Sequence, residues 1–420
     1  MRIVRFFAVI LIAGLVGYYI GITKVDFAWK NFRPHVQVEG KEPPPSVTNV
    51  DFTKFWSVLQ KIEENYYDKT AIDSQKLLDG AISGMVDSLE DPYTVYLPPV
   101  QNTDFKDGLA GEFSGIGAEL GLEEKQVIVV APIDGSPAEK AGIKPGDSIV
   151  KVDDEFTVGW TLNETVEKIR GPKGTKVALT VVRKSETEPK VLNITRDTIT
   201  IKSVTSSVKA VKDIENITLT DTLKANQNDK VAYIRLSQFG DNTNKEWLDM
   251  SNNLSRQMKA DPAIKGIVLD IRNNPGGYLT DAVFISSEFL KVGTPVVLQD
   301  DGRGRTGKLV VERQGLMQDT PLIILINKGS ASASEILAGA MRDHNRAQLF
   351  GEVSFGKGTI QNAEELGEGS GLHVTIAKWL TPNGTWVHKT GLTPDITVAL
   401  DQKQPERDLQ LERALETLVK

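Results

Sequence analysis

The chain has 420 residues, enough for about three domains of ordinary size. Its composition, with 40% hydrophobic and 25% charged residues, is typical of a globular protein with an ample core. A net charge of −7 without a basic stripe disfavours nucleic acid as a partner. There is no cysteine, which excludes disulfides, thiol catalysis and thiolate metal sites, and no cluster has zinc-ligand spacing, so we expect no metal or other cofactor.

The first distinctive segment is an uncharged run at residues 6–22, preceded by Arg2 and Arg5. As a helix it would rise about 26 Å, the lower limit for spanning a bilayer. A cleaved signal peptide is the alternative, but no small-residue cleavage pattern follows, which favours an uncleaved signal anchor at 1–24. We therefore expect a membrane-anchored protein whose remainder is exported to the periplasmic or extracytoplasmic side. Three basic residues just beyond the run weaken this orientation: Lys24, Lys30 and Arg33.

Residues 25–50 include three consecutive prolines at 43–45, which is typical of a semi-rigid linker. Within 51–107, apolar residues recur at helical spacing up to Leu89 and predict two amphipathic helices, closed by a turn at Asp91-Pro92. We expect the aromatic residues of this region to pack inside the protein: Phe55, Trp56, Tyr66 and Tyr67.

Residues 108–198 are rich in short strands and glycine turns. Ser136 to Asp154 predicts a short helix, a Lys-Pro-Gly-Asp turn and a strand, and 161–170 and 176–183 predict a second helix and a further strand. This order resembles a PDZ domain of the circularly arranged kind found in bacterial proteases. The resemblance implies a β-rich domain that binds peptide C-termini.

The PDZ resemblance implies a ligand loop at Ser114, Gly115, Ile116 and Gly117. Successive amides around the two glycines can hold a peptide carboxylate while the peptide adds as an extra strand, and a glycine turn without a ligand is the alternative. Arg170, at the end of the second helix, matches the place where some proteases of this kind couple the PDZ domain to the active site. A lone arginine there is also typical of a solvated helix C-terminus.

Residues 199–400 are predicted to form a separate α/β domain. A polar stretch at 203–230 has no pattern that we can interpret, and alternating strands and helices follow it at 231–239, 244–259, 264–271, 280–291 and 294–299. This alternation implies right-handed crossovers and a largely parallel sheet covered by helices. Strands around an Asn-Gly turn are expected within 372–398, and a surface helix ends the chain at 401–420.

The stretch from Pro321 to Asp343 predicts a buried strand, a glycine turn and an amphipathic helix that opens with small residues. The first amides of a helix lack internal partners and lie at the positive end of its dipole, so they would stabilise an anion formed next to Ser332. Ser332 is therefore a candidate nucleophile. The alternative is a capping box, in which Ser332 and Glu335 only complete the helix terminus.

The segment FGKGTIQ places Lys357 between two glycines, which let the backbone approach neighbouring groups closely. Lys357 is therefore a candidate base. A Ser/His/Asp triad is the competing mechanism, with His344, His373 or His388 as base and Asp343 or Asp395 as acid. No histidine has a recognisable setting, and His344 lies about 18 Å from Ser332 along the same helix, which excludes it.

SASASE, followed 25 residues after its middle serine by the lysine of FGKG and then by Gln361, resembles the carboxy-terminal processing peptidases, tail-specific serine proteases of the S41 family. By position, the resemblance implies that Ser332 is the nucleophile, Lys357 the general base and Gln361 the residue that orients the lysine. It also implies a core fold shared with Clp proteases and crotonases, with an N-terminal helical segment and an inserted PDZ domain.

The segment RNNPGGYL, from Arg272 to Leu279, leaves a strand in a glycine turn before a helix. In the family such a turn supplies part of the oxyanion hole, which here implies Gly276 or Gly277 with Ala333 as the partner amide. A plain strand-to-helix turn is the alternative.

These observations predict an endopeptidase that cleaves exported proteins near free, apolar C-termini, with the PDZ domain recognising the substrate and gating activity. A PDZ adaptor with an inactive core and a crotonase-like acyl-transfer enzyme are the alternatives. A homo-oligomer and an adaptor protein remain open as further partners.

Overall fold

The computed structural model describes residues 25–30, 33–38, 50–123, 126–133, 135–183, 188–399 and 407–420. The predicted signal anchor at 1–24 lies outside these residues. No helix in the described part of the chain is both long enough and apolar enough to cross a membrane. The chain divides into two units, residues 1–78 and 79–420, which we describe separately.

The first unit contains a hairpin and the N-terminal helices. The antiparallel strands β1 (Val25–Lys30) and β2 (Arg33–Val38) fall where the sequence predicts a linker. They are followed by α2 (Thr53–Asn65), the short η2 (Lys69–Ala71) and the start of α3 (Ser74–Asp87), which confirm the two predicted helices.

The expected packing of the N-terminal aromatic residues is wrong for this unit. Trp56 is 61% exposed and Tyr67 is 99% exposed, and Phe55 and Tyr66 are also exposed. No residue of α2 is buried, although the helix carries apolar residues at helical spacing.

The PDZ region of the second unit is built on one sheet with the strand order β10-β9-β7-β6-β5, from which β8 pairs with β7. Its strands are β5 (Ala118–Glu123), β6 (Gln126–Pro132), β7 (Ser148–Val152), β8 (Glu155–Phe156), β9 (Lys176–Val182) and β10 (Lys190–Thr195). The helices α5 (Pro137–Lys140) and α6 (Leu162–Ile169) occur where the sequence predicts them. This region has its own apolar core, which includes Val129, Ile149 and Leu179.

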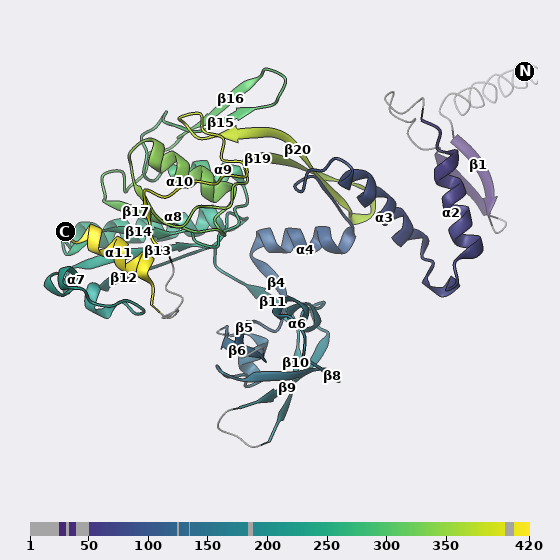
Figure 1. Cartoon of the computed structure of the whole chain (residues 1–420), viewed down its shortest axis with the longest axis horizontal. Helices are drawn as coiled ribbons and strands as arrows, with labels where there is room; N and C mark the ends of the chain where they lie inside the picture. Colours follow the sequence, from purple (N-terminus) through teal and green to yellow (C-terminus); the bar gives the residue numbers. More distant parts are fainter. Residues whose placement is uncertain are drawn as a thin grey trace, which may run out of the picture. The chain divides into compact units, whose positions relative to one another are not determined.

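The PDZ region is an insertion whose entry and exit strands pair. The chain reaches it through β3 (Val95–Leu97) and α4 (Pro99–Ala110), and enters on β4 (Glu112–Gly115). It leaves on β11 (Asp197–Thr200), which is antiparallel to β4 (Figure 1). The strand β3, before the insertion, pairs with β20 (Gly371–Leu380), far beyond it in the sequence.

The main sheet of the core has the order β12-β13-β14-β17-β18-β21 within the described residues. Its strands are β12 (Val204–Ala210), β13 (Lys230–Leu236), β14 (Ile264–Asp270), β17 (Leu322–Ile326), β18 (Gln348–Gly351) and β21 (Ile396–Thr397). All neighbours are parallel except β12 and β13. The uninterpreted stretch 203–230 thus supplies the edge strand β12, with η3 (Val211–Asp213) and α7 (Asp221–Ala225).

The strand predicted at 294–299 is β15 (Pro295–Asp300), but it belongs to a second, antiparallel sheet. There it lies between β16 (Thr306–Val310) and β20, and β20 also pairs with β19 (Thr359–Glu365). The alternation of helices and strands along the chain cannot predict in which of the two sheets β15 lies, because it does not show which strand β15 pairs with.

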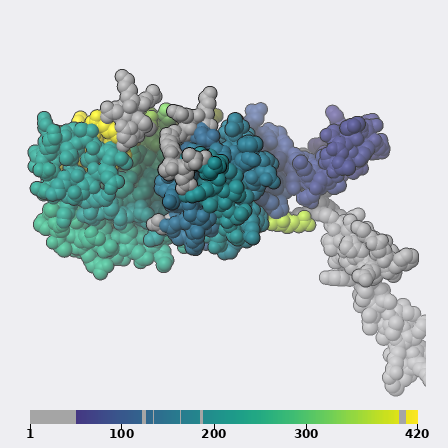
Figure 2. Space-filling model, turned by 90° about the horizontal axis from the view of Figure 1, so that it is seen from below, coloured from purple at the N-terminus to yellow at the C-terminus, as the bar shows by residue number. Residues whose placement is uncertain are grey.

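Side chains on the two faces of the main sheet belong to two separate apolar layers. Residues such as Ile234 and Ile324 pack with α8 (Thr243–Ala260), α9 (Leu279–Ser286) and α10 (Ala333–Asp343). Their neighbours Val231 and Ile323 pack with α11 (Leu409–Leu418), so the helix predicted within 401–420 is present but packs on the sheet. In the space-filling view, the teal and green surface of the core is continuous, with yellow C-terminal residues at its border (Figure 2).

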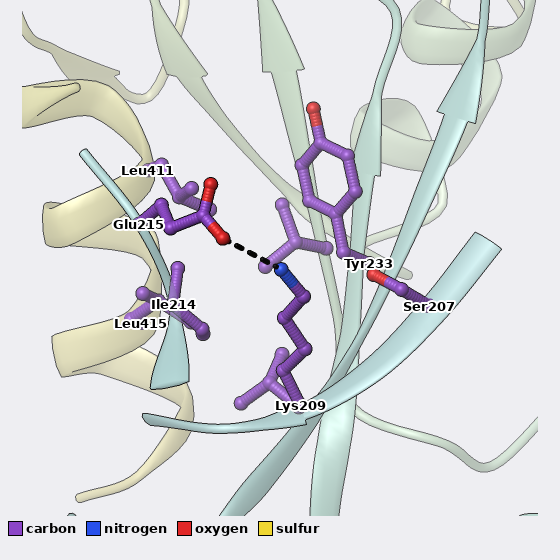
Figure 3. A pocket seen from close by; sticks show the side chains of 9 residues that line it. Ser207, Lys209, Ile214, Glu215, Tyr233, Leu411 and Leu415 are labelled. Carbon is purple, nitrogen blue, oxygen red and sulfur yellow. Dashed lines mark ion pairs between the residues drawn. The ribbon is translucent and has the colours of Figure 1, made fainter. Parts of the chain in front are cut away.

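A cavity of about 220 Å³ lies on the α11 side of this sheet (Figure 3). Leu411 and Leu415 line it from α11, and Tyr233 lines it from β13. Lys209 and Glu215 form an ion pair of 3.6 Å beside it. None of its lining residues is a predicted site residue.

Candidate active site

Ser332 lies on the turn between the fully buried strand β17 and helix α10. Its backbone has φ +53° and ψ −115°, a region that residues other than glycine rarely adopt, so the surrounding structure must impose it. Helix α10 begins at Ala333, whose amide has no hydrogen-bond acceptor in the described part of the chain, as expected for the first residue of a helix.

The serines on either side of Ser332 attach this turn to the glycine turn after β14. Ser330 and Ser334 are fully buried, and their hydroxyls donate to the carbonyls of Ile271 and Asn274, each at 2.9 Å. The alternating serines of SASAS therefore divide into two structural hydroxyls and one, on Ser332, that is only partly buried.

Position 276 must be a glycine, because its backbone passes too close to Ser332 to leave space for a side chain. With φ +102°, it lies where a β-carbon would come 2.8 Å from both the Ala331 carbonyl oxygen and Ser332 Cβ. Its amide donates to Asn274 Oδ1 at 2.9 Å, so the predicted oxyanion role of this amide is not available in this structure. Gly277, the other predicted glycine, has no acceptor for its amide among the described residues.

Glu335 connects the backbones of Ser332 and Lys357, a link that the sequence did not reveal. The carboxylate is fully buried, and its Oε2 accepts the amides of Ser332 and Lys357, each at 2.9 Å. Its Oε1 accepts the Ser354 hydroxyl at 2.5 Å and the Gly356 amide at 2.7 Å. The capping contact expected from Ser332 and Glu335 is thus present, and it is compatible with Ser332 acting as a nucleophile.

Lys357 lies on the loop before β19, where its side chain is partly buried. Burial lowers the pKa of Lys357 below its ordinary value, while the negative charges of Asp91 and Glu335 act in the opposite direction. The amine lies 5.1 Å from the ring centroid of Tyr93, and Trp379 Nε1 donates to the Lys357 carbonyl at 2.9 Å. No hydrogen bond joins Lys357 Nζ and Ser332 Oγ in the described structure.

The orienting bond predicted between Gln361 and Lys357 is not formed. Gln361 Nε2 donates instead to the hydroxyls of Thr359 at 2.9 Å and Thr375 at 3.1 Å. The cause is strand register, since β19 places Gln361 directly opposite Thr375 on β20.

The histidines do not form a triad with Ser332 in the described structure. His344 Nε2 lies 2.7 Å from the Pro295 carbonyl oxygen, His373 packs edge-on against Phe105, and His388 stacks on Trp386. The two candidate acids accept backbone amides instead, Asp343 from Asn383 and Asp395 from Leu349.

The predicted peptide-binding residues lie close together in the PDZ region. Ser114 and Gly115 belong to β4, opposite Thr198 and Asp197 of β11, while Ile116 is buried and Gly117 has φ +74°. Arg170 directly follows α6, and its exposed guanidinium lies 5.1 Å from the ring centroid of Phe113.

The strand β5, which follows the Ser114–Gly117 loop, ends the described PDZ sheet. No further strand pairs with its outer edge in the described residues, and an unpaired edge is the kind of site to which a peptide strand can add. No group of three or more His, Cys, Asp or Glu side chains in the described part of the chain could hold a metal ion.

Three protein-family models match successive parts of the chain. Residues 230–398 match peptidase family S41, residues 128–183 match a PDZ domain, and residues 11–99 match the N-terminal domain of the activating protease CtpB.

Two similar proteins of Bacillus subtilis are the carboxy-terminal processing proteases CtpA and CtpB. Each is 37% identical to this chain, over 83% and 84% of the chain and 69% and 68% of the respective relative. The structure of a photosystem II D1 C-terminal processing protease is similar with a TM-score of 0.50 and 30% identity, covering 84% of this chain and 95% of that one. The chain therefore belongs to the carboxy-terminal processing proteases, serine proteases of peptidase family S41.

Proposed function

We propose that this protease cleaves peptide bonds with a dyad in which Ser332 is the nucleophile and Lys357 the general base. The observation that carries the proposal is the buried Glu335 carboxylate, whose Oε2 accepts the amides of both residues at 2.9 Å. Ser332 and Lys357, 25 positions apart in the sequence, are thereby bound through their backbones to the same carboxylate oxygen. The glycine turn at Gly276 lies beside Ser332.

The chemistry is acyl transfer. Neutral Lys357 takes the proton of the Ser332 hydroxyl, whose oxygen attacks the substrate carbonyl to form a tetrahedral intermediate. The amides of Ala333 and Gly277, which have no acceptor among the described residues, stabilise its oxyanion. The ammonium of Lys357 returns the proton to the leaving amine. Water then releases the acyl group from the serine, with Lys357 again as base.

This role requires Lys357 to be neutral at working pH. An exposed lysine has a pKa near 10.4, so a lowering of about three units, roughly 4 kcal/mol, is needed for half of the side chains to be neutral near pH 7. Burial of Lys357 acts in the required direction, and closure of the site over a substrate would exclude more water from the amine.

The substrate is a protein with a free, apolar C-terminus. The open edge of β5 suits a peptide added as a strand, and the loop from Ser114 to Gly117 suits its carboxylate. Arg170 couples peptide binding in the PDZ region to the activity of the core. The apolar run at 6–22 supports a membrane anchor with the catalytic part exported.

The test is cleavage of an unfolded protein by the full-length chain in detergent. Ser332→Ala and Lys357→Ala should each reduce the rate at least about a thousandfold with the fold intact. Lys357→Arg should not restore it, because a guanidinium stays charged. A rapid Lys357→Ala enzyme would overturn the dyad, and wild type that binds C-termini without cutting would indicate the adaptor function.

A further inference from the structure

The turn that precedes β3 lies beside Lys357, although the whole PDZ region separates the two in the sequence. β3 pairs with β20, with Val95 opposite His373. Thr94 Oγ1 accepts the Thr375 amide at 3.1 Å and donates to Asp91 Oδ2 at 2.7 Å. Asp91 Oδ1 in turn accepts the Tyr93 amide at 3.1 Å, so the backbone that carries Tyr93 is bonded to the core.

Tyr93 is part of an aromatic wall next to the lysine loop. Its ring centroid lies 5.1 Å from Lys357 Nζ and 6.0 Å from the His388 ring, which stacks on Trp386 at 5.0 Å. Trp386 Nε1 donates to the Gly358 carbonyl at 2.8 Å. The wall therefore combines residues from before the PDZ insertion with residues from beyond Lys357.

We propose that Tyr93 is a positioning residue for the general base, whose ring covers the amine of Lys357 and keeps water from it. The proposal rests on the proposed function of Lys357. The environment of Lys357 is therefore formed by residues from both sides of the PDZ region, including the turn before β3.

Two effects of the ring oppose each other. The negative face of an aromatic ring favours the ammonium, typically by about 0.5–2 kcal/mol, whereas displacement of water favours the neutral amine and shifts buried lysines by up to 3–5 units. At 5.1 Å the ring is near the long end of the range for a cation above a ring, so we expect water exclusion to prevail.

The ionisable groups around the amine do not all favour its neutral form. Asp91 from the turn before β3 and Glu335 from α10 favour the ammonium, and His373 on β20 has a pKa lowered by burial and by Lys357. Burial and the charge of Glu335 raise the pKa of the Tyr93 phenol. The ring therefore covers the amine without adding a negative charge of its own at neutral pH.

The test replaces Tyr93 in the full-length protein and follows Lys357 in two ways. Tyr93→Phe and Tyr93→Leu keep an apolar cover, whereas Tyr93→Ala admits water. The pH dependence of kcat/KM reports the base in the free enzyme. Carbon-13 NMR of Lys357 Cε, with Ser332→Ala in every protein, measures the titration of the amine without using activity.

Tyr93→Ala should raise both midpoints by about one pH unit, which lowers kcat/KM about tenfold on the acidic side. Tyr93→Phe and Tyr93→Leu should keep both midpoints near those of wild type. Phe156→Ala is the matched control, since it removes an exposed ring that lies over a different lysine, Lys151 of the PDZ region, and should move neither midpoint. If Tyr93→Ala does not fold, Tyr93→Gln places a polar group beside the amine and should raise the midpoints in the same way.

An unchanged NMR midpoint in a folded Tyr93→Ala or Tyr93→Gln protein would overturn the proposal, as would a Tyr93→Leu midpoint as high as that of Tyr93→Ala. These outcomes are distinct from failure of the dyad. That failure would appear as rapid cleavage by Lys357→Ala, while the NMR midpoints still decide what Tyr93 does to the amine.

Discussion

Two turns of this protein carry serine and glycine residues, but they are held in different ways. The turn at Ser332 is surrounded by buried groups. The hydroxyls of Ser330 and Ser334 donate hydrogen bonds to the neighbouring turn, and the space around Gly276 is too small for a β-carbon at that position. The segment from Ser114 to Gly117 precedes β5, the end strand of the PDZ sheet. Its first two residues pair with β11, and Gly115 lies close to the exposed Arg170.

The difference corresponds to two tasks. A nucleophile and its oxyanion donors must be fixed before the reaction, because reorganisation during the reaction costs free energy. A peptide site must instead leave backbone groups unpaired so that a new strand can add. The predictions below test this contrast between a fixed turn and an open sheet edge, in order of decreasing effect.

The largest effect is expected from Glu335→Gln. An amide has one acceptor oxygen in place of two, so at least one of the four donors around the buried carboxylate would lose its partner. We expect the free energy of unfolding to fall by about 2–4 kcal/mol and cleavage to fall at least a hundredfold. Urea unfolding and kcat measure these losses.

Glu364→Gln is the matched control for this substitution. Glu364 is an exposed residue of β19 whose carboxylate accepts only the Asn362 amide group in the described structure, so it should change neither quantity. A Glu335→Gln enzyme with wild-type stability and rate would mean that the Ser332 turn is not held in the way described.

A smaller effect is expected at the open edge of the PDZ sheet. A peptide with an apolar C-terminus should bind the protein at least about tenfold more tightly than its C-terminal amide, a difference of ~1.4 kcal/mol or more from one charge-assisted contact. Isothermal titration with the Ser332→Ala protein measures both affinities without cleavage. Equal affinities would remove carboxylate capture by Ser114 to Gly117 from the proposed function.

If PDZ binding also gates the core, a non-cleavable apolar peptide should accelerate cleavage of a second substrate. Arg170→Ala should weaken that acceleration, while the rate without peptide stays the same. An acceleration that is unaffected by Arg170→Ala would assign the arginine to the solvated surface of α6.

The smallest effect is expected from Gln361→Ala. Its amide donates to Thr359 and Thr375 and not to Lys357, so we expect kcat to fall less than about threefold, with no shift of its pH profile. A profile displaced to higher pH would instead show that Gln361 reaches the amine during the reaction, as the family resemblance implies.

The amino-acid sequence by itself determined the local structure of the site. An apolar run followed by glycine and small residues dictates a buried strand and a helix N-terminus, which is how Ser332 could be found. The glycines around Lys357 marked a loop able to approach other groups, and helical periodicity located α2, α3 and α11. These features depend on residues that are close in the chain.

Only the tertiary structure decided which distant segments meet. The four hydrogen bonds of Glu335, the ring of Tyr93 over Lys357 and the register that turns Gln361 toward Thr375 join residues from different elements. The same reason explains why β15 joins a second sheet and why the aromatic residues of α2 are exposed. Periodicity shows that a face is apolar, but partners far along the chain decide whether and by what it is covered.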